Sequence, residues 1–157
     1  MGTHSRIAVM HGTVCKSVYC HWDGYLSFNG RILQESYDSS KANKLVALGD
    51  LSSLRATIGE KHAFSSFDLP AEEVEAFKTL TENMCTFYGR DRGEKHTEWK
   101  VAVNFETFLE QCYNSGAEYY YIMKDDVWYC GDTYGTTDLS TKLTLLSDAL
   151  KQETAKA

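Results

Sequence analysis

Residues 19–25, in the order Tyr-Cys-His-Trp-Asp-Gly-Tyr, hold the densest group of chemically versatile side chains in the sequence. Aromatic faces stack on planar or apolar parts of a ligand, while an imidazole and a carboxylate supply a donor, an acceptor and a charge. Gly24 allows the backbone to turn tightly. The alternative is that Trp22 and the tyrosines anchor the core and Asp23 caps the turn. The recognition hypothesis names five candidate binding residues: Tyr19, His21, Trp22, Asp23 and Tyr25.

A second group follows at residues 87–94, in the order Phe-Tyr-Gly-Arg-Asp-Arg-Gly-Glu. Two arginines bracketed by glycines predict a flexible cationic tip, and guanidinium groups bind phosphate or carboxylate oxygens in a bidentate way. Asp91 and Glu94 lie close enough in the sequence to neutralise the arginines, so a local salt-bridge network is the alternative. The candidate binding residues of this segment are Tyr88, Arg90, Asp91, Arg92 and Glu94.

Signatures of catalysis are weaker than these recognition signals. The sequence contains no Gly-x-Ser-x-Gly elbow, Walker loop or Gly-x-Gly-x-x-Gly motif. Two sets of metal-ligating residue types match no zinc spacing: Cys15 with Cys20 and His21, and His4 with His11 and Asp23. A metal-dependent nuclease or hydrolase remains the catalytic alternative, with His21, Asp23 and Asp91 as its residues. We therefore expect a protein without a cofactor that is not an enzyme.

Short strands and helices must position both segments. Residues 7–9 and 14–20 favour strands and predict a hairpin through the turn at residues 11–12. Further strands are expected at 85–88, 99–103, 118–123 and 127–130. Helices are expected within 29–38, from a cap at Ser39 or Ser40 to Gly49, from Pro70 through Leu80, and from Asn104 to about 114. A final amphipathic helix is predicted by the spacing of Leu139, Leu143, Leu146 and Leu150.

Hairpins interspersed with helices predict an α+β fold with a mainly antiparallel sheet, several short helices and a C-terminal amphipathic helix. The chain has one proline and no repeat or low-complexity stretch. We therefore expect residues 1–157 to form a single domain.

Charge and composition exclude some classes of protein. The 157 residues carry a net charge of −6, and the acidic excess lies in the C-terminal two thirds. This balance argues against direct nucleic-acid binding. An acidic face can repel nucleic acid or can mimic it toward a basic protein partner, and composition alone does not decide between the two. No apolar run approaches the roughly 18 residues of a membrane span, and the N-terminus lacks the apolar core of a signal peptide. Five scattered cysteines predict reduced, buried thiols, so we expect a cytoplasmic protein.

Four stretches (residues 1–7, 19–25, 48–54 and 87–94) together resemble a family of small bacteriophage accessory proteins. The resemblance covers residues 1–130, whereas 131–157, a turn plus the C-terminal helix, is peculiar to this chain. His4 stands where the family pattern has arginine, which puts a role for a basic side chain there in doubt. The resemblance implies expression in the cytoplasm of a host bacterium, but it supplies no reaction, ligand or catalytic residue.

Small accessory proteins of this class commonly act by binding. The leading hypothesis is an inhibitor of a bacterial defence system, an anti-CRISPR or another anti-defence protein, that contacts a host nuclease or complex. Ten tyrosines and three tryptophans, types favoured at interfaces, agree with it. The alternative is a protein that sequesters a nucleotide-like anion, with Trp22 and Tyr25 stacking the base and Arg90 and Arg92 holding phosphate. A homodimer through the helix at residues 139–150 is a further hypothesis.

Overall fold

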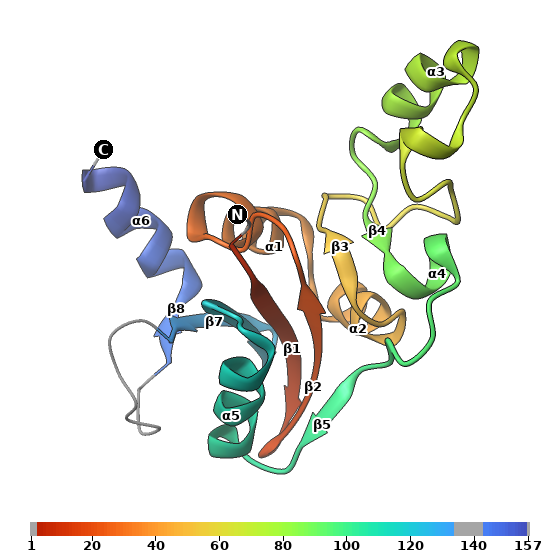
Figure 1. Ribbon diagram of the computed structural model, residues 1–157. Coiled ribbons are helices and arrows are strands. Elements are labelled where there is room, and N and C mark those ends of the chain that lie inside the picture. The colour runs from red at the N-terminus through yellow and green to blue at the C-terminus, as the bar shows by residue number, and fades with distance from the viewer. Residues whose placement is uncertain (1–2, 134–142, 157) are drawn as a thin grey trace.

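The computed structural model describes residues 3–133 and 143–156 of the chain (Figure 1). The strands in these ranges are β1 (Ser5–His11), β2 (Val14–Cys20), β3 (Leu51–Ser53), β4 (Thr86–Phe87), β5 (Lys100–Ala102), β6 (Tyr119–Lys124), β7 (Val127–Asp132) and β8 (Thr144–Leu145). The helices are α1 (Arg31–Ser36), α2 (Ser39–Ala47), α3 (Ala71–Thr81), α4 (Tyr88–Arg92), α5 (Phe105–Ser115) and α6 (Leu146–Lys156). Two short helical turns, η1 (Leu26–Gly30) and η2 (Ser66–Asp68), are also present.

The strands form one mixed sheet in the order β4-β3-β2-β1-β6-β7-β8, and β5 also pairs with β2. Most neighbouring strands are antiparallel, whereas β1 with β6 and β2 with β3 are parallel. The two predicted hairpins are confirmed as β1–β2 and β6–β7. The chain is a single α+β domain with a mostly antiparallel sheet, as the sequence predicts.

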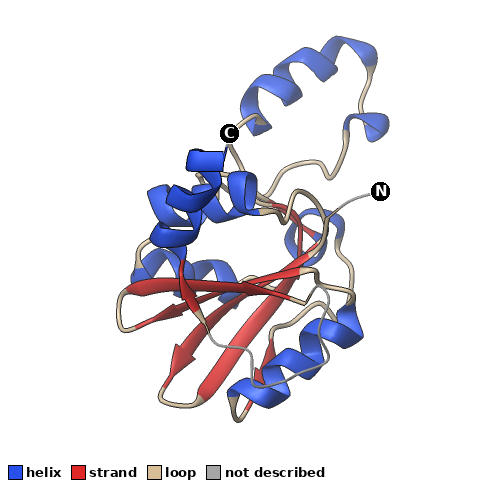
Figure 2. Cartoon of the chain, turned by 90° about the vertical axis from the view of Figure 1, so that its left-hand side faces the viewer, coloured by secondary structure: helices blue, strands red, loops and turns tan. Residues whose placement is uncertain are grey.

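Helices cover both faces of the sheet (Figure 2). Helices α1, α2 and α6 pack on one face, against a core that includes Ile7 and Val9 of β1. Helix α5 packs on the other face, against a core that includes Ala8 and Met10. Successive side chains of a strand point to opposite faces. The two layers of helices therefore explain why the first six residues of β1 are all buried.

Capping side chains set where two of the helices begin. The Asp38 side chain accepts a 2.8 Å hydrogen bond from the backbone N–H of Lys41, so α2 is capped one residue before the predicted Ser39. The predicted cap of α5 is confirmed, because the Asn104 side chain accepts a 2.8 Å bond from the N–H of Thr107. The caps fix the ends of helices that pack on the sheet.

The C-terminal helix starts later than the leucine spacing predicts. Helix α6 begins at Leu146, Leu143 precedes it without helical structure, and Leu139 lies outside the described residues. Leu146 and Leu150 are buried in the core of the chain itself. These two leucines stabilise the domain and are not free to form the proposed dimer contact.

Helix α3 does not cover the sheet. It projects away from the body of the molecule (Figure 1), and none of its residues is buried. The helix predicted from Pro70 is confirmed, but its apolar stripe does not pack into the core, and Leu80 remains 60% exposed. We call residues 60–82, which include η2 and α3, the arm. Its base is closed where the N–H of Thr57 donates to the carbonyl of Asn83 at 3.0 Å.

All five cysteines are buried and unbridged, which confirms the prediction of reduced thiols. No helix within the described ranges combines the length and the apolar character needed to cross a membrane.

Candidate functional site

The short strand β3 brings the two predicted recognition segments to one edge of the sheet, because β2 and β4 both pair with it. The N–H of Trp22 donates to the carbonyl of Ser52 at 3.0 Å, and the N–H of Tyr88 donates to the carbonyl of Asp50 at 3.1 Å. Residues 19–25 and 87–94 therefore flank β3. We call the surface around β3 the aromatic edge, defined by Tyr19, His21, Trp22, Tyr25, Tyr88 and Arg92.

An imidazole pair lies on the first flank of the aromatic edge. The rings of His4 and His21 stack with centroids 4.6 Å apart, and the Trp22 ring meets His21 edge-on at 4.7 Å. The Tyr19 hydroxyl lies 3.0 Å from Nδ1 of His21. Burial, together with the neighbouring His4, lowers the pKa of His21. This imidazole is held in a fixed orientation and is disposed to stay neutral.

The turn after His21 is set by backbone conformation and backbone hydrogen bonds. Asp23 has a φ of +57°, and its carbonyl accepts a 3.2 Å bond from the N–H of Asn29. A Cβ on Gly24 would lie 2.9 Å from the carbonyl oxygen of Thr3, so only glycine fits that position. Trp22 and Tyr25 are 45% and 37% exposed, which contradicts the alternative that they anchor the core. Their exposed rings give the aromatic edge its recognition character.

The second flank is a helix and not the predicted flexible tip. Helix α4 covers residues 88–92 and ends at Gly93, which adopts a φ of +71°. The buried carboxylate of Asp91 explains this local structure. It accepts hydrogen bonds from the N–H of Phe87 at 2.8 Å and from the N–H of His62 at 3.1 Å. These contacts tie α4 to β4 and to the start of the arm.

Arg90 is a structural residue. Its guanidinium pairs with Asp91 at 2.9 Å and donates to the carbonyls of Ile58, Gly59 and Cys85 at 3.0, 3.1 and 3.0 Å. The side chain is only 12% exposed. Because its donors are directed to groups of the chain itself, Arg90 does not provide the phosphate clamp that the sequence suggests.

Arg92 lies at the surface of the aromatic edge. Its guanidinium carbon is 4.5 Å from the ring centroid of Phe64 and 4.9 Å from that of Tyr88, and these two rings stack at 5.6 Å. Arg92 also forms an ion pair with Glu94, and both side chains are roughly half exposed. The pairs Arg90–Asp91 and Arg92–Glu94 confirm the salt-bridge alternative for this segment.

Sequence reasoning missed three residues that shape this region. Asp50 accepts a 2.9 Å bond from the N–H of Tyr19, Phe64 stacks on Tyr88, and His62 contacts Asp91. All three lie in residues 50–68, a stretch without helical or strand periodicity, for which the sequence predicts no helix or strand. The segment instead contains β3 and the start of the arm.

The residues of the hydrolase alternative do not form one centre. Asp91 is buried between Phe87, His62 and Arg90, whereas Asp23 belongs to the turn beside Gly24. Within the part of the chain that the structure describes, no group of three His, Cys, Asp or Glu side chains is placed to hold a metal ion.

Comparisons with protein-family models, with curated proteins and with solved structures give no match to this chain. The function is therefore inferred from the geometry of the aromatic edge and of the arm.

Proposed function

We propose that the protein acts by binding and inhibiting a basic protein partner, a nucleic-acid-handling enzyme of a bacterial defence system. The arm carries this proposal, because it combines uncovered apolar side chains with a net charge of −4, against −6 for the whole chain.

The apolar part of the arm consists of side chains that a folded domain normally covers. Phe67 is 96% exposed and Leu80 is 60% exposed. Exposed apolar patches on otherwise well-packed domains are typical of protein-protein interfaces, and aromatic residues are enriched in such interfaces. Val74 and Phe77, which share the helix face of Leu80, are half-buried. The arm thus offers a partner an apolar ridge that this domain leaves uncovered.

The charge of the arm selects the kind of partner. Residues 60–82 contain six acidic residues and two lysines, a net charge of −4 out of −6 for the whole chain. A partner that binds nucleic acid presents a basic groove, and an acidic segment is attracted to such a groove. The arm therefore supports inhibition by occupation of a nucleic-acid site.

The base of the arm is held to the body of the domain. The His62 ring lies between the carbonyl oxygens of Ala63 and Cys85, at 2.7 and 2.9 Å, and its Nε2 is 3.6 Å from Asp91. Held segments lose less conformational entropy on binding than free ones. The Asp91 carboxylate also accepts the hydrogen bond from the N–H of Phe87 at the start of α4. The arm and the aromatic edge are therefore both held by contacts to Asp91. This arrangement supports a contact surface that includes both.

The experiment is capture from bacterial lysate followed by an activity assay on the captured enzyme. The double variant Phe67→Ser/Leu80→Ser removes the apolar ridge, and Val103→Ser is the matched control, since Val103 is 65% exposed on another part of the domain. We expect the wild type and the control to capture a stoichiometric basic enzyme and inhibit it. The double variant should do neither.

Charge is tested separately with the triple variant Glu72→Gln/Glu73→Gln/Glu75→Gln. It should slow association at low salt and lose most of its difference from the wild type at high salt, because exposed charges are screened over about 10 Å or less. Equal capture and inhibition by the arm variants and the wild type would overturn the proposal. So would a wild type that captures no stoichiometric protein.

A further inference from the structure

The arm joins the body of the domain beside β4 and α4 (Figure 1), and the buried ring of His62 lies at this junction. The side chain is 3% exposed, and the ring of Phe77 in α3 packs against it with centroids 6.1 Å apart. Nδ1 lies 2.7 Å from the carbonyl oxygen of Ala63, and Nε2 lies 2.9 Å from that of Cys85, the residue before β4. Each ring nitrogen therefore faces a carbonyl oxygen, which can only accept a hydrogen bond.

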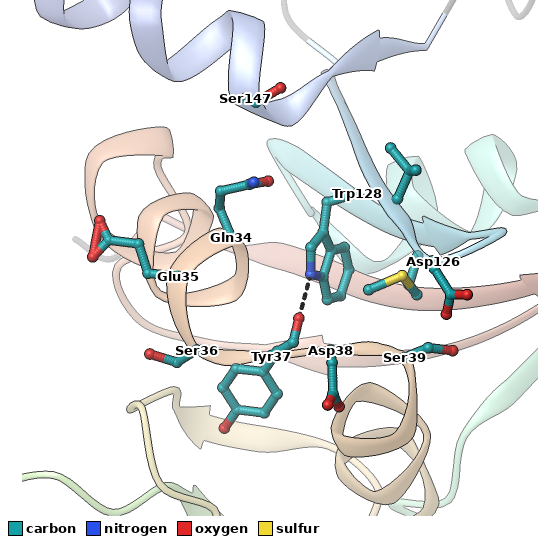
Figure 3. A pocket seen from close by; sticks show the side chains of 11 residues that line it. Gln34, Glu35, Ser36, Tyr37, Asp38, Ser39, Asp126, Trp128 and Ser147 are labelled. Carbon is teal, nitrogen blue, oxygen red and sulfur yellow. Dashed lines mark hydrogen bonds between the residues drawn. The ribbon is translucent and has the colours of Figure 1, made fainter.

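Both of these contacts require a hydrogen on the ring nitrogen. A neutral imidazole carries a hydrogen on one nitrogen and a lone pair on the other, so a neutral ring would set one lone pair against a carbonyl oxygen. The indole of Trp128 gives a reference within the same molecule, because its Nε1 always carries a hydrogen and donates to the carbonyl of Tyr37 at 2.9 Å (Figure 3). The two His62 contacts are as short as this one. Both nitrogens of His62 therefore act as donors, as in the imidazolium form.

The opposite orientation of the ring does not explain the contacts. Rotation by half a turn would place carbon atoms of the His62 ring where the two nitrogens lie, 2.7 and 2.9 Å from the carbonyl oxygens. A C–H group contacts a carbonyl oxygen at a carbon–oxygen distance of about 3.3–3.6 Å. The short distances therefore identify nitrogen donors at both positions.

Two charged groups of the body face this ring. Oδ2 of Asp91 lies 3.6 Å from Nε2 of His62, and Arg90 pairs with Asp91 and donates to the same Cys85 carbonyl at 3.0 Å. From α3 the contact is the uncharged ring of Phe77. Asp91 favours a positive charge on the imidazole and Arg90 opposes it. The two carbonyl contacts consequently decide which protonation state fits the junction.

Loss of the proton makes one of the two contacts repulsive. If the remaining hydrogen stays on Nδ1, the repulsion falls on the Cys85 carbonyl, which joins the arm to the body. If it stays on Nε2, the repulsion falls on Ala63, and the first residues of the arm must shift. We propose that His62 is a proton-dependent latch, whose protonated ring holds the start of the arm on the body and whose deprotonation releases it.

The attachment of the arm at its base does not involve the ring. The N–H of Thr57 donates to the carbonyl of Asn83 at 3.0 Å, and the N–H of Cys85 donates to the carbonyl of Thr57 at 2.9 Å. Deprotonation therefore changes the orientation of the arm while the arm stays attached. The arm is held at low pH and released as pH rises. A partner contact that weakens with rising pH follows from the latch, and this consequence rests on the proposed function.

NMR of the free protein between about pH 5 and pH 8, the range in which histidines change charge, tests the latch. Nitrogen chemical shifts report which ring nitrogens carry a hydrogen, and the nuclear Overhauser effect between the rings of His62 and Phe77 reports whether the arm is held. As pH rises, we expect His62 to lose its proton and this ring contact to weaken. The backbone N–H of His62, which donates to Asp91, should lose about tenfold of its exchange protection with the same midpoint.

His62→Gln removes the titrating ring and should keep this protection at a constant low level across the pH range. His11→Gln is the matched control, since His11 is exposed at the end of β1, and it should behave as the wild type. An equal pH-dependent loss in His62→Gln and in the wild type would overturn the proposal.

A second contrary result requires no variant. It is a wild-type His62 ring with a hydrogen on only one nitrogen while its contact with Phe77 keeps full strength. Since all of these measurements use the protein alone, a failure of the latch is distinguishable from a failure of the partner-capture experiment.

Discussion

The backbone N–H of Tyr19 donates a 2.9 Å hydrogen bond to Oδ1 of Asp50. This bond lies at a gap in the sheet, because β2 pairs with β3 at Cys20 and with β5 at Ser17, and neither strand reaches the N–H between them. A side-chain carboxylate completes the backbone bonding there. Burial raises the pKa of Asp50, so the fold holds this charge against a desolvation penalty.

Asp50→Asn should remove the part of the pH dependence of stability that comes from this buried carboxylate. Asparagine keeps an oxygen acceptor for the Tyr19 N–H and removes the charge. Because the pKa of Asp50 is raised on folding, its stabilising contribution is present when it is protonated and is lost as pH rises through its folded value. Urea unfolding between about pH 4 and pH 7 should show the wild type losing stability relative to the variant as pH rises. A difference of the opposite slope would contradict the assignment.

Arg90→Ala should strongly destabilise the domain. It leaves the carboxylate of Asp91 buried without its cation and removes donors to Ile58, Gly59 and Cys85. Breaking a buried ion pair lowers the free energy of unfolding by about 3–5 kcal/mol. Urea denaturation measures this loss.

Arg92→Ala is the internal control for Arg90→Ala. Its ion pair with Glu94 is about half exposed, so the expected loss is under about 1 kcal/mol. Equal losses for the two variants would show that Arg90 is not the support of α4 and of the base of the arm.

The imidazole pair predicts a titration that NMR can follow. Burial and the proximity of His4 lower the pKa of His21, so its ring signals should titrate below about 6.5. His4→Asn removes the neighbouring imidazole and should move the pKa of His21 upward, although not fully, because burial remains. A His21 that titrates at its ordinary value in the wild type would refute the stacked arrangement.

Thiol reactivity should be low in the folded protein. Burial raises the pKa of Cys20 and Cys112 to about 12 and that of Cys15 and Cys130 to about 11, and it also raises the pKa of Cys85. Thiolates are the reactive form, so an aromatic disulfide reagent at neutral pH should label almost no thiol in the native state. All five should react in urea. Rapid labelling of one native cysteine would locate an opening in the core.

Local sequence signals predict the elements better than they predict the site. The Asn104 cap and the hairpins at residues 7–20 and 118–130 depend on neighbouring residues, and all three are confirmed. For residues 88–92, which form helix α4, the sequence predicts a flexible tip, because Gly89 and Gly93 disfavour a helix locally. Its structure depends on the burial of Asp91 against the distant His62. Contacts between residues far apart in the chain do not appear in the spacing of apolar residues, so the sequence pattern does not predict them.

The same limit applies to the candidate site. The exposed aromatic residues of the segment 19–25 are recognisable from composition, and the structure places Trp22 and Tyr25 at the surface. Their position beside α4 follows from the pairing of β3 with both β2 and β4, which joins segments far apart in the chain. The exposure of the arm also cannot be predicted from the sequence, because the apolar stripe of α3 is typical of a helix that packs on a core. Only the tertiary structure shows that the domain leaves this stripe uncovered.

The parallel pairing of β1 with β6 has a consequence for biosynthesis. Ser5 pairs with Tyr119, 114 residues later in the chain. During translation the β1–β2 hairpin emerges first, and one side of its apolar strand β1 has no neighbour until β6 has left the ribosome. Open strand edges recruit other chains. Products of premature termination or proteolysis that end before Tyr119 leave this strand edge unpaired and should therefore aggregate.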